Sequence, residues 1–231
     1  MMMSDTIKKV WELLRVFAPI ATLRFNLHYL PFPDAIKFPV FVYRHTRLVQ
    51  LKGRLHIMSP ICSGMIKLGH YVRGTQDERY SDTTWEVIGD INFQGEACIG
   101  RGTKLSVGNN ATLDVGERLT ISGDTEVYCH HNIIIGAECT ISWGCLVMDT
   151  DFHPIYDAST NILLNDNKPI TIGKHVWLGC RSVVLKGVSV ADDTVIAAGS
   201  LISKPIQDKK CVVGGRGNDA RVILPNVRWE N

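Results

Sequence analysis

The sequence lacks an apolar run long enough to cross a membrane. A helix that spans a bilayer needs ~20 mostly apolar residues, and no stretch of the chain approaches that length. The apolar stretch nearest the N-terminus is interrupted by Glu12 and Arg15, so it does not have the pattern of a secretory leader. We therefore expect a soluble or peripheral protein.

The cysteines lack the spacing of a metal centre. Seven are present, an odd number with no CxxC pair, and this composition favours a reducing, cytoplasmic compartment. Cys139 and Cys145 lie six positions apart and are expected to fill the core. Cys129 precedes His130 and His131, but adjacent side chains on a strand point to opposite faces, so we expect no metal site.

Charge is nearly balanced over the whole chain but unevenly placed. The net charge is +2 over 231 residues, yet residues 1–60 carry nine Lys/Arg against three Asp/Glu. This +6 segment leaves −4 for the remainder, and it has two interpretations. It either faces an anionic surface, such as a membrane or a phosphorylated glycan carrier, or it is a solvated helix face. Nothing in the composition indicates a nucleic-acid partner.

What the sequence does have is a period of six. Starting at Ile172, every sixth residue is aliphatic up to Ile202, and a second small or β-branched residue follows four positions after most of them. Neither a helix nor an alternating strand has this period. A hexad with glycines at the bends predicts a parallel β-helix in which three hexads, 18 residues, form one triangular coil. The aliphatic series is Ile172, Leu178, Val184, Val190, Ile196 and Ile202.

A looser hexad register extends the β-helix toward the N-terminus from Trp85. Its two-residue slips are interpreted as lengthened corners, and Gly108, Asn109 and Asn110 lie at one of them, where a positive φ is expected. About six or seven coils fit between residues 50 and 205, and stacking buries one continuous core. The expected inward residues are Phe93, Ile99, Leu105, Leu113, Leu119, Ile121, Val127, Ile133, Ile135, Ile141 and Val147.

The segments outside this register are predicted from local patterns. Apolar residues at helical spacing from Ile7 to Ala21 predict an amphipathic helix that Pro19 kinks or ends. It either packs on the β-helix or lies on a membrane interface. Residues 31–45 are expected to be a connector entering a strand, and residues 73–82 an exposed loop. Residues 149–169 are too polar and too long for a corner, so they form a loop extruded from the coils.

The stretch IGKHVWLGCRSVVLKGVSVADDTVIAAGSLISK, from Ile172 to Lys204, resembles the C-terminal coils of the hexapeptide-repeat acyltransferases. The resemblance covers residues 87–224 and is closest to bacterial sugar and capsular-polysaccharide O-acetyltransferases. It implies a mainly β protein with a left-handed parallel β-helix, although parallel crossovers are normally right-handed. The division that follows is an N-terminal helical and connector segment (1–47), the β-helix (48–206) and a C-terminal tail that closes the cofactor site (207–231).

The extruded loop contains the candidate catalytic residues. Asp149, Asp151 and His153 alternate, so an extended segment would point all three side chains the same way. From the residues alone, His153 is a surface histidine, a loop-stapling group or a general base. The resemblance implies the last, because DFHP matches the family's catalytic histidine followed by proline. Asp149 and Asp151 would then orient His153 or bind sugar hydroxyls.

The resemblance further implies acetyl-CoA as cosubstrate, with no metal required. Small residues of the regular coils would let coenzyme A approach the backbone. Lys204 and Arg221 would contact its phosphates. Trp177 would either line the site of the thioester or act as a structural wedge. The segment GNDARVI matches the family's GNPARVI, with Asp219 in place of proline. The predicted cofactor-binding residues are Trp177, Gly179, Ser182, Ala197, Ala198, Gly199, Lys204 and Arg221.

The resemblance also implies a homotrimer in which neighbouring subunits share each active site. Asn132 and Trp143 are candidates for lining the acceptor site. The leading function is O-acetylation of a sugar hydroxyl during surface-polysaccharide or glycan assembly. N-acylation of an amino sugar or amino acid and a non-catalytic scaffold stay open as alternatives.

Overall fold

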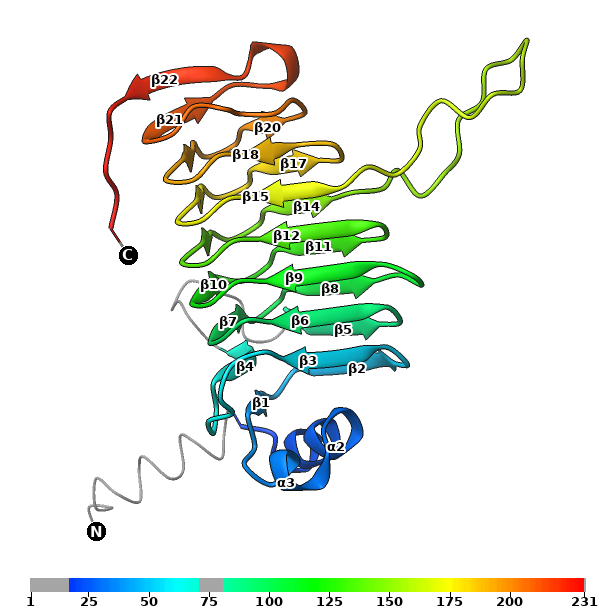
Figure 1. Ribbon diagram of the computed structural model, residues 1–231, viewed down its shortest axis with the longest axis vertical. Coiled ribbons are helices and arrows are strands. Elements are labelled where there is room, and N and C mark those ends of the chain that lie inside the picture. The colour runs from blue at the N-terminus through cyan, green and yellow to red at the C-terminus, as the bar shows by residue number, and fades with distance from the viewer. Residues whose placement is uncertain (1–16, 71–80, 231) are drawn as a thin grey trace.

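The computed structural model describes residues 17–70 and 81–230, in which short strands stack into a tall prism (Figure 1). Every strand up to Gly214 pairs in parallel with at least one strand of a neighbouring coil. In the last coils the paired residues are 18 positions apart, as in Thr171 with Ser189 and Val183 with Leu201. The predicted coil of three hexads is therefore confirmed.

Three sheets form the sides of the prism. The nine-stranded sheet contains β1 (Val40–Val42), β4 (Ile66–His70), β7 (Ala97–Gly100), β10 (Leu119–Ile121), β13 (Thr140–Ile141), β16 (Trp177–Leu178), β19 (Val195–Ile196), β21 (Cys211–Gly214) and β22 (Arg221–Pro225). The seven-stranded sheet contains β2 (Thr46–Leu51), β5 (Thr83–Val87), β8 (Lys104–Val107), β11 (Glu126–Cys129), β14 (Leu146–Met148), β17 (Val183–Leu185) and β20 (Leu201–Ile202). The six-stranded sheet contains β3 (Arg54–Ile57), β6 (Asp90–Phe93), β9 (Thr112–Val115), β12 (Asn132–Ile135), β15 (Ile170–Ile172) and β18 (Ser189–Val190).

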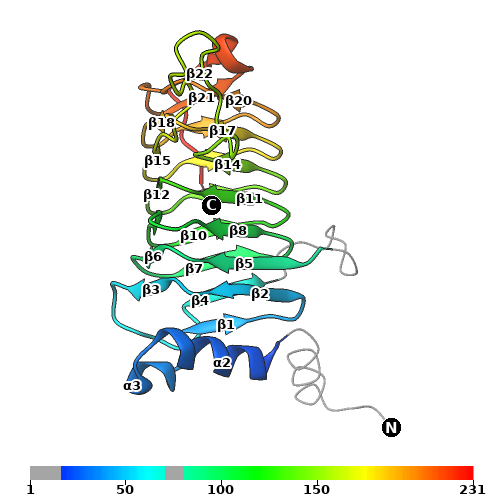
Figure 2. The same cartoon turned by 90° about the vertical axis from the view of Figure 1, so that its right-hand side faces the viewer.

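The coil is left-handed. Strands of the six-stranded sheet run from right to left across the near side in Figure 1 while the chain climbs, and Figure 2 places these strands on the side that corresponds to that near face. Seen from the upper end of the prism, the chain therefore turns clockwise as it approaches the viewer. This is the sense of a left-handed coil. The handedness implied by the family resemblance is confirmed.

One continuous aliphatic core fills the prism. All the residues predicted to point inward are buried, from Phe93 to Ile202. Each sits directly above or below another, as Ile141 lies between Ile121 and Leu178. Cys139 and Cys145 are buried among them, as expected, and their Sγ atoms donate to the carbonyl oxygens of Gly173 and Gly179.

The corners are tight because backbone stacks on backbone there. A Cβ atom on Gly116 would lie 2.3 Å from the carbonyl carbon of Gly136, and one on Gly136 would lie 2.5 Å from that of Gly173. Such distances exclude any side chain from this column. Asn110 has φ +58° at the lengthened corner of residues 108–111, as the sequence indicated. We name two other corners: the groove corner, where the chain passes from the nine- to the seven-stranded sheet, and the arm corner, where it passes from the seven- to the six-stranded sheet.

The N-terminal end of the prism is capped by two short helices, α2 (Pro19–Tyr29) and α3 (Phe32–Ala35). The prediction that Pro19 kinks or ends a helix is wrong: Pro19 opens α2, a position where its missing N–H leaves no intrahelical hydrogen bond unmade. The predicted helix is also wrong at Phe17, which forms a bridge with Tyr43. The rest of that prediction, and most of the loop predicted at 73–82, lie outside the described residues.

The C-terminal residues close the other end. Strand β22 turns back antiparallel on β21 after a short 3₁₀ turn, Gly217–Asp219. The chain then runs back along the outside of the prism (Figure 1). There the Trp229 ring stacks on His175 with centroids 4.2 Å apart. The division of the chain at residues 47 and 206 stays a prediction.

Candidate active site

Residues 149–169 leave the prism between β14 and β15 as a long projecting loop, which we call the arm (Figure 1). Its two sides are tied together, since Leu164 N donates to Ile155 O over 2.8 Å and Tyr156 forms a bridge with Leu163. At the tip, the Asp157 carboxylate accepts hydrogen bonds from Ser159 and Thr160, which hold the pKa of Asp157 well below its usual range. The arm is therefore an ordered element and confirms the predicted extrusion.

The base of the arm is held by a lysine from the next coil. Lys186 Nζ donates to Asp151 Oδ2 over 2.5 Å and to Asn165 O over 2.7 Å. Asn165 Nδ2 also donates to Asp151 Oδ2, over 2.8 Å, which joins the two sides of the arm. These bonds, first that from Lys186, lower the pKa of Asp151. We call Asp151, Asn165 and Lys186 the neck clamp.

The neck clamp fixes the backbone on which His153 sits. His153 N donates to Asp151 O over 2.7 Å, and Asn165 Nδ2 donates to His153 O over 2.9 Å. Phe152 has φ +60°, which turns the chain sharply just before the histidine. The His153 side chain is exposed, and its imidazole has no hydrogen-bond partner within residues 17–70 and 81–230. It is therefore free to meet a ligand.

A cavity of about 290 Å³ opens at the neck of the arm and brings two histidines together. Its lining includes His153, Asp151 and Asn165, and also His130 from the coil below. The His130 ring packs over Gly108, where a Cβ atom would lie 2.8 Å from Nδ1. Its Nε2 atom is buried and has no partner among the described residues. His130 was not among the predicted site residues, and the structure places it beside His153 in the lining of this cavity.

Asp149 does not share a side with Asp151 and His153, which corrects the expectation drawn from their alternation. Its carboxylate is buried and accepts the backbone N–H groups of His130 and His131, over 2.7 and 2.9 Å. Neither Asp149 nor Asp151 contacts the His153 imidazole. The Asp149 carboxylate instead accepts backbone N–H groups, and the Asp151 carboxylate accepts the Lys186 and Asn165 side chains.

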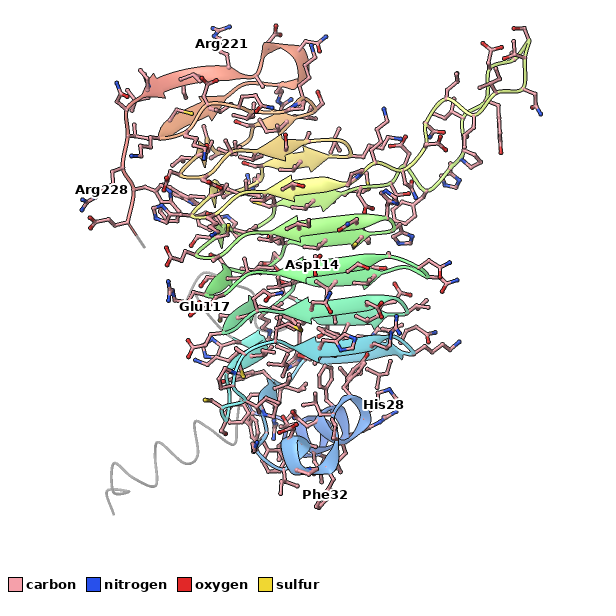
Figure 3. All side chains as sticks on the ribbon, in the orientation of Figure 1. His28, Phe32, Asp114, Glu117, Arg221 and Arg228 are labelled. Atoms are coloured by element: carbon pink, nitrogen blue, oxygen red, sulfur yellow. The ribbon has the colours of Figure 1, made fainter. Side chains whose placement is uncertain are left out.

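Half of the predicted cofactor residues gather elsewhere, at the groove corner near the C-terminal end. A cleft of about 500 Å³ is lined by Ala197, Ala198, Gly199 and Arg221, together with Arg216. A Cβ atom on Gly199 would meet nothing within 4 Å, so the backbone is open to a ligand there. Figure 3 shows Arg221 at this end of the molecule. Arg216 is a second guanidinium that the sequence analysis missed, because it lies outside the matched segment.

The other predicted cofactor residues do not line this cleft. Trp177 is partly exposed on β16, and its Nε1 donates to Ser142 Oγ over 2.9 Å. Gly179 packs closely beneath Ala198 N. The Ser182 hydroxyl lies in the core and donates to Gly179 O over 2.6 Å, so its side chain does not face solvent. Lys204 is exposed beyond β20.

The two predicted acceptor residues lie at different corners. Asn132 begins β12 beside the arm corner, whereas Trp143 is exposed at the groove corner. The seven-stranded sheet separates these corners. Within one chain the structure therefore groups the candidate residues into two half-sites, one around His153 and one around Ala198.

The described residues offer neither a metal-binding group nor a membrane-spanning helix. Residues 17–70 and 81–230 contain no group of three or more His, Cys, Asp or Glu side chains placed to hold a metal ion. Among the same residues, no helix combines the length and apolar character that crossing a bilayer requires.

Comparison with known proteins identifies the repeat. Residues 169–204 match the family described as bacterial transferase hexapeptide (six repeats). The chain is 30% identical over 137 residues to a polysialic acid O-acetyltransferase of Escherichia coli O1:K1 / APEC, which covers 59% of this chain and 41% of the relative. It is 32% identical over 108 residues to a galactoside O-acetyltransferase of Lactococcus lactis, which covers 44% of this chain and 49% of the relative.

A solved structure shares the fold over most of the chain. The crystal structure of the polySia specific acetyltransferase NeuO superposes with a TM-score of 0.53 at 25% sequence identity, covering 80% of this chain and 82% of that one. By contrast, the chain spans less than half the length of the curated relatives named above. The hexapeptide repeat and the β-helix are thus shared with sugar O-acetyltransferases, and the sequence similarity is concentrated in part of each protein.

Proposed function

We propose that this hexapeptide-repeat protein is an acetyl-CoA-dependent O-acetyltransferase that acts on a sugar hydroxyl in surface-polysaccharide or glycan assembly. The observation that carries the proposal is His153, an exposed imidazole on a fixed backbone at the mouth of a cavity. The names of the relatives support the choice of reaction, since those named above are O-acetyltransferases of polysialic acid or galactosides.

In the proposed reaction His153 is the general base. Its imidazole takes the proton from an acceptor hydroxyl while that oxygen attacks the thioester carbonyl of acetyl-CoA. The carbon–sulfur bond breaks, and the proton passes to the departing thiolate of coenzyme A. A neutral imidazole suits this role near neutral pH, and one positioned base contributes about 10²–10⁴-fold in rate. His130 lines the same cavity as His153 and would lie beside the acceptor.

The groove corner has the chemistry that coenzyme A requires. The open backbone at Ala198 and Gly199 would bind the pantetheine arm, and Arg216 and Arg221 would bind phosphates, for which guanidinium groups form strong charge-assisted hydrogen bonds. Lys204, exposed just beyond the last coil, would add a further positive charge. Trp177 would contact the thioester end of the cofactor.

We further propose a homotrimer that joins the two half-sites. In the upper coils, the outer side of the seven-stranded sheet is apolar, with Leu146 aligned to Val183 and Met148 to Leu185. In the lower coils the aligned outer residues are polar or charged, as in Lys104 and Glu126. Packing the apolar part against a second copy, under closed symmetry, would bring one chain's arm corner beside another chain's groove corner.

The arm is the second support for this assembly. Its large apolar side chains are exposed in the single chain, and an exposed apolar segment of this size indicates an interface. They are Phe152, Ile155, Tyr156, Ile162, Leu163 and Leu164. A neighbouring copy would cover them, and light scattering after size exclusion is expected to give three times the mass of the 25.7 kDa chain. We place the enzyme in the cytoplasm, in keeping with its free cysteines.

The proposal is tested by thiol release from acetyl-CoA in the presence of a panel of sugars, amino sugars and serine. We expect release with sugars that offer free hydroxyls, and a melting temperature that rises with coenzyme A concentration. Release only with amines would indicate N-acylation instead. Absence of both coenzyme A binding and thiol release would indicate a scaffold.

A further inference from the structure

An exposed apolar surface lies at the N-terminal end of the prism, far from the arm and the groove corner (Figure 3). Helix α2 buries Thr22, Phe25 and Asn26 against the first coil, yet its opposite side is also apolar. Ile20, Leu23 and Leu27 recur there at helical spacing and are 83%, 46% and 45% exposed. A surface helix normally presents charged or polar residues on that side, so α2 departs from the usual pattern.

Helix α3 extends the same surface. Phe32 and Ile36 are 69% and 51% exposed, and Figure 3 shows Phe32 at the extreme tip of the molecule, pointing away from the coils. Single exposed apolar side chains are ordinary, but five large ones gather here, on α2, on α3 and at the C-cap of α3. Such a concentration of exposed apolar side chains is typical of an interaction site. We call Ile20, Leu23, Leu27, Phe32 and Ile36 the end face.

Cations border the end face. Arg24 and Arg44 line an apolar groove of about 500 Å³ together with Ile20. Both guanidinium groups lack an ion-pair partner within residues 17–70 and 81–230, whereas Lys37 is paired with Asp34 over 2.9 Å. Arg47 is exposed on the neighbouring strand β2. An apolar patch bordered by unpaired arginines complements a layer that has phosphates outside and hydrocarbon inside.

We propose that the end face docks on the surface of an anionic lipid bilayer. Ile20, Leu23 and Phe32 would enter the boundary between headgroups and acyl chains, and Arg24 and Arg44 would contact lipid phosphates. A second copy is a poorer occupant, because end-to-end packing would bring the arginines of one copy close to those of the other, where like charges repel. In the trimer proposed above, closed symmetry points all three end faces the same way, so that three weak contacts reinforce one another.

The docking would hold the enzyme at the membrane while the arm and the groove corner, which lie toward the other end, stay accessible from the aqueous side. This inference goes beyond the proposed acetyl transfer and does not depend on it. A protein with a silent active site could still dock, and an active transferase could lack the docking surface.

Cosedimentation of the full chain with vesicles tests the inference. The probes are phosphatidylcholine vesicles with and without phosphatidylglycerol, at low and high salt. We expect binding to the anionic vesicles that weakens with salt. Ile20→Asp with Phe32→Asp is expected to lower this binding at least tenfold. Arg24→Gln with Arg44→Gln, which removes two positive charges, is expected to weaken its salt dependence.

A matched control adds the same two charges away from the end face. Thr171→Asp with Leu224→Asp changes two exposed positions and is expected to bind as the unchanged protein does. Circular dichroism and thiol release with a freely dissolved sugar are expected to be unaffected in every variant. Vesicle binding that persists in Ile20→Asp with Phe32→Asp would overturn the inference and locate the membrane contact elsewhere in the chain. A loss of self-association in that variant, without vesicle binding by the unchanged protein, would identify a second copy as the occupant.

Discussion

The Lys186 ammonium lies 2.5 Å from the Asp151 carboxylate, although the two residues are 35 positions apart. Lys186 belongs to the coil above the arm and Asp151 to the base of the arm, so this ion pair fastens the arm to the prism. Asn165 Nδ2 donates to the same carboxylate oxygen and also to the backbone carbonyl oxygen of His153. The position of the proposed base thus depends on a residue that never touches it.

Lys186→Met is therefore expected to lower kcat/KM roughly ten- to hundredfold, because small displacements of a catalytic group are costly in rate. Coenzyme A binding, measured by the shift in melting temperature, is expected to stay unchanged. Lys209→Met is the matched control, since Lys209 forms a comparable ion pair with Asp192 at a different corner. If both variants lost activity equally, the clamp would have no specific role.

The arm is expected to loosen in acid before the coils do. Its hydrogen bonds lower the pKa of Asp151 in the folded protein relative to the unfolded chain. The bonds therefore stabilise the fold above the ordinary aspartate pKa of ~3.9 and are lost as the pH falls through the lowered value. Asp157 at the tip acts in the same direction.

Hydrogen exchange measures this loosening. The protection factor of the Leu164 amide, bonded to Ile155 O, is expected to fall below about pH 4, while that of the Gly173 amide, bonded to Val190 O in the coils, is retained. Equal loss at both amides would show that the arm has no separate acid response. In Lys186→Met the pKa of Asp151 is expected to rise.

The buried cysteines are expected to resist alkylation in the native protein. Burial raises the pKa of Cys139 and of Cys145 to about 11, so that little of either thiol is the reactive thiolate at pH 8. Cys62 is exposed. Iodoacetamide followed by mass spectrometry is expected to modify Cys62 first and to reach Cys139 and Cys145 only in denaturant. Rapid native labelling of Cys145 would contradict its place in the core.

Leu178→Ala is expected to lower the free energy of unfolding by about 2–5 kcal/mol, the range for a buried leucine truncated to leave a cavity. Leu178 is fully buried and lies between Ile141 and Ile196 in the stack. Leu224→Ala, at a position 54% exposed on β22, serves as the control and is expected to change stability by less than about 0.5 kcal/mol. Denaturant titration measures both values.

The hexad series predicted the coils because every coil repeats the same local rule. Ile172 and Leu178 occupy equivalent inward positions of successive hexads, and each stacks on its counterpart 18 residues away. An error in assigning one coil therefore does not change the assignment of the next. The role of Pro19 was predicted wrongly because a proline can end one helix or begin the next. The spacing of apolar residues did not distinguish these cases.

The candidate site was less predictable because its geometry is set by contacts distant in sequence. Asp149, Asp151 and His153 alternate along the chain, yet only Asp151 and His153 line the cavity. The backbone amides of His130 and His131 hold the Asp149 carboxylate apart from them. Lys186 carries no local pattern that marks it as a clamp. Arg216 and His130 become candidates only in the folded structure. There Arg216 lines the same cleft as Arg221, and His130 lines the same cavity as His153.

The most direct test of the central claim is the turnover of His153→Ala against His131→Ala, measured as thiol release from acetyl-CoA with a sugar acceptor. Both histidines are exposed near the arm corner, but only His153 lines the cavity. We predict that His153→Ala loses about 10²–10⁴-fold in kcat with an unchanged melting temperature and coenzyme A response, while His131→Ala stays close to the unchanged protein. Full turnover by His153→Ala would contradict the account.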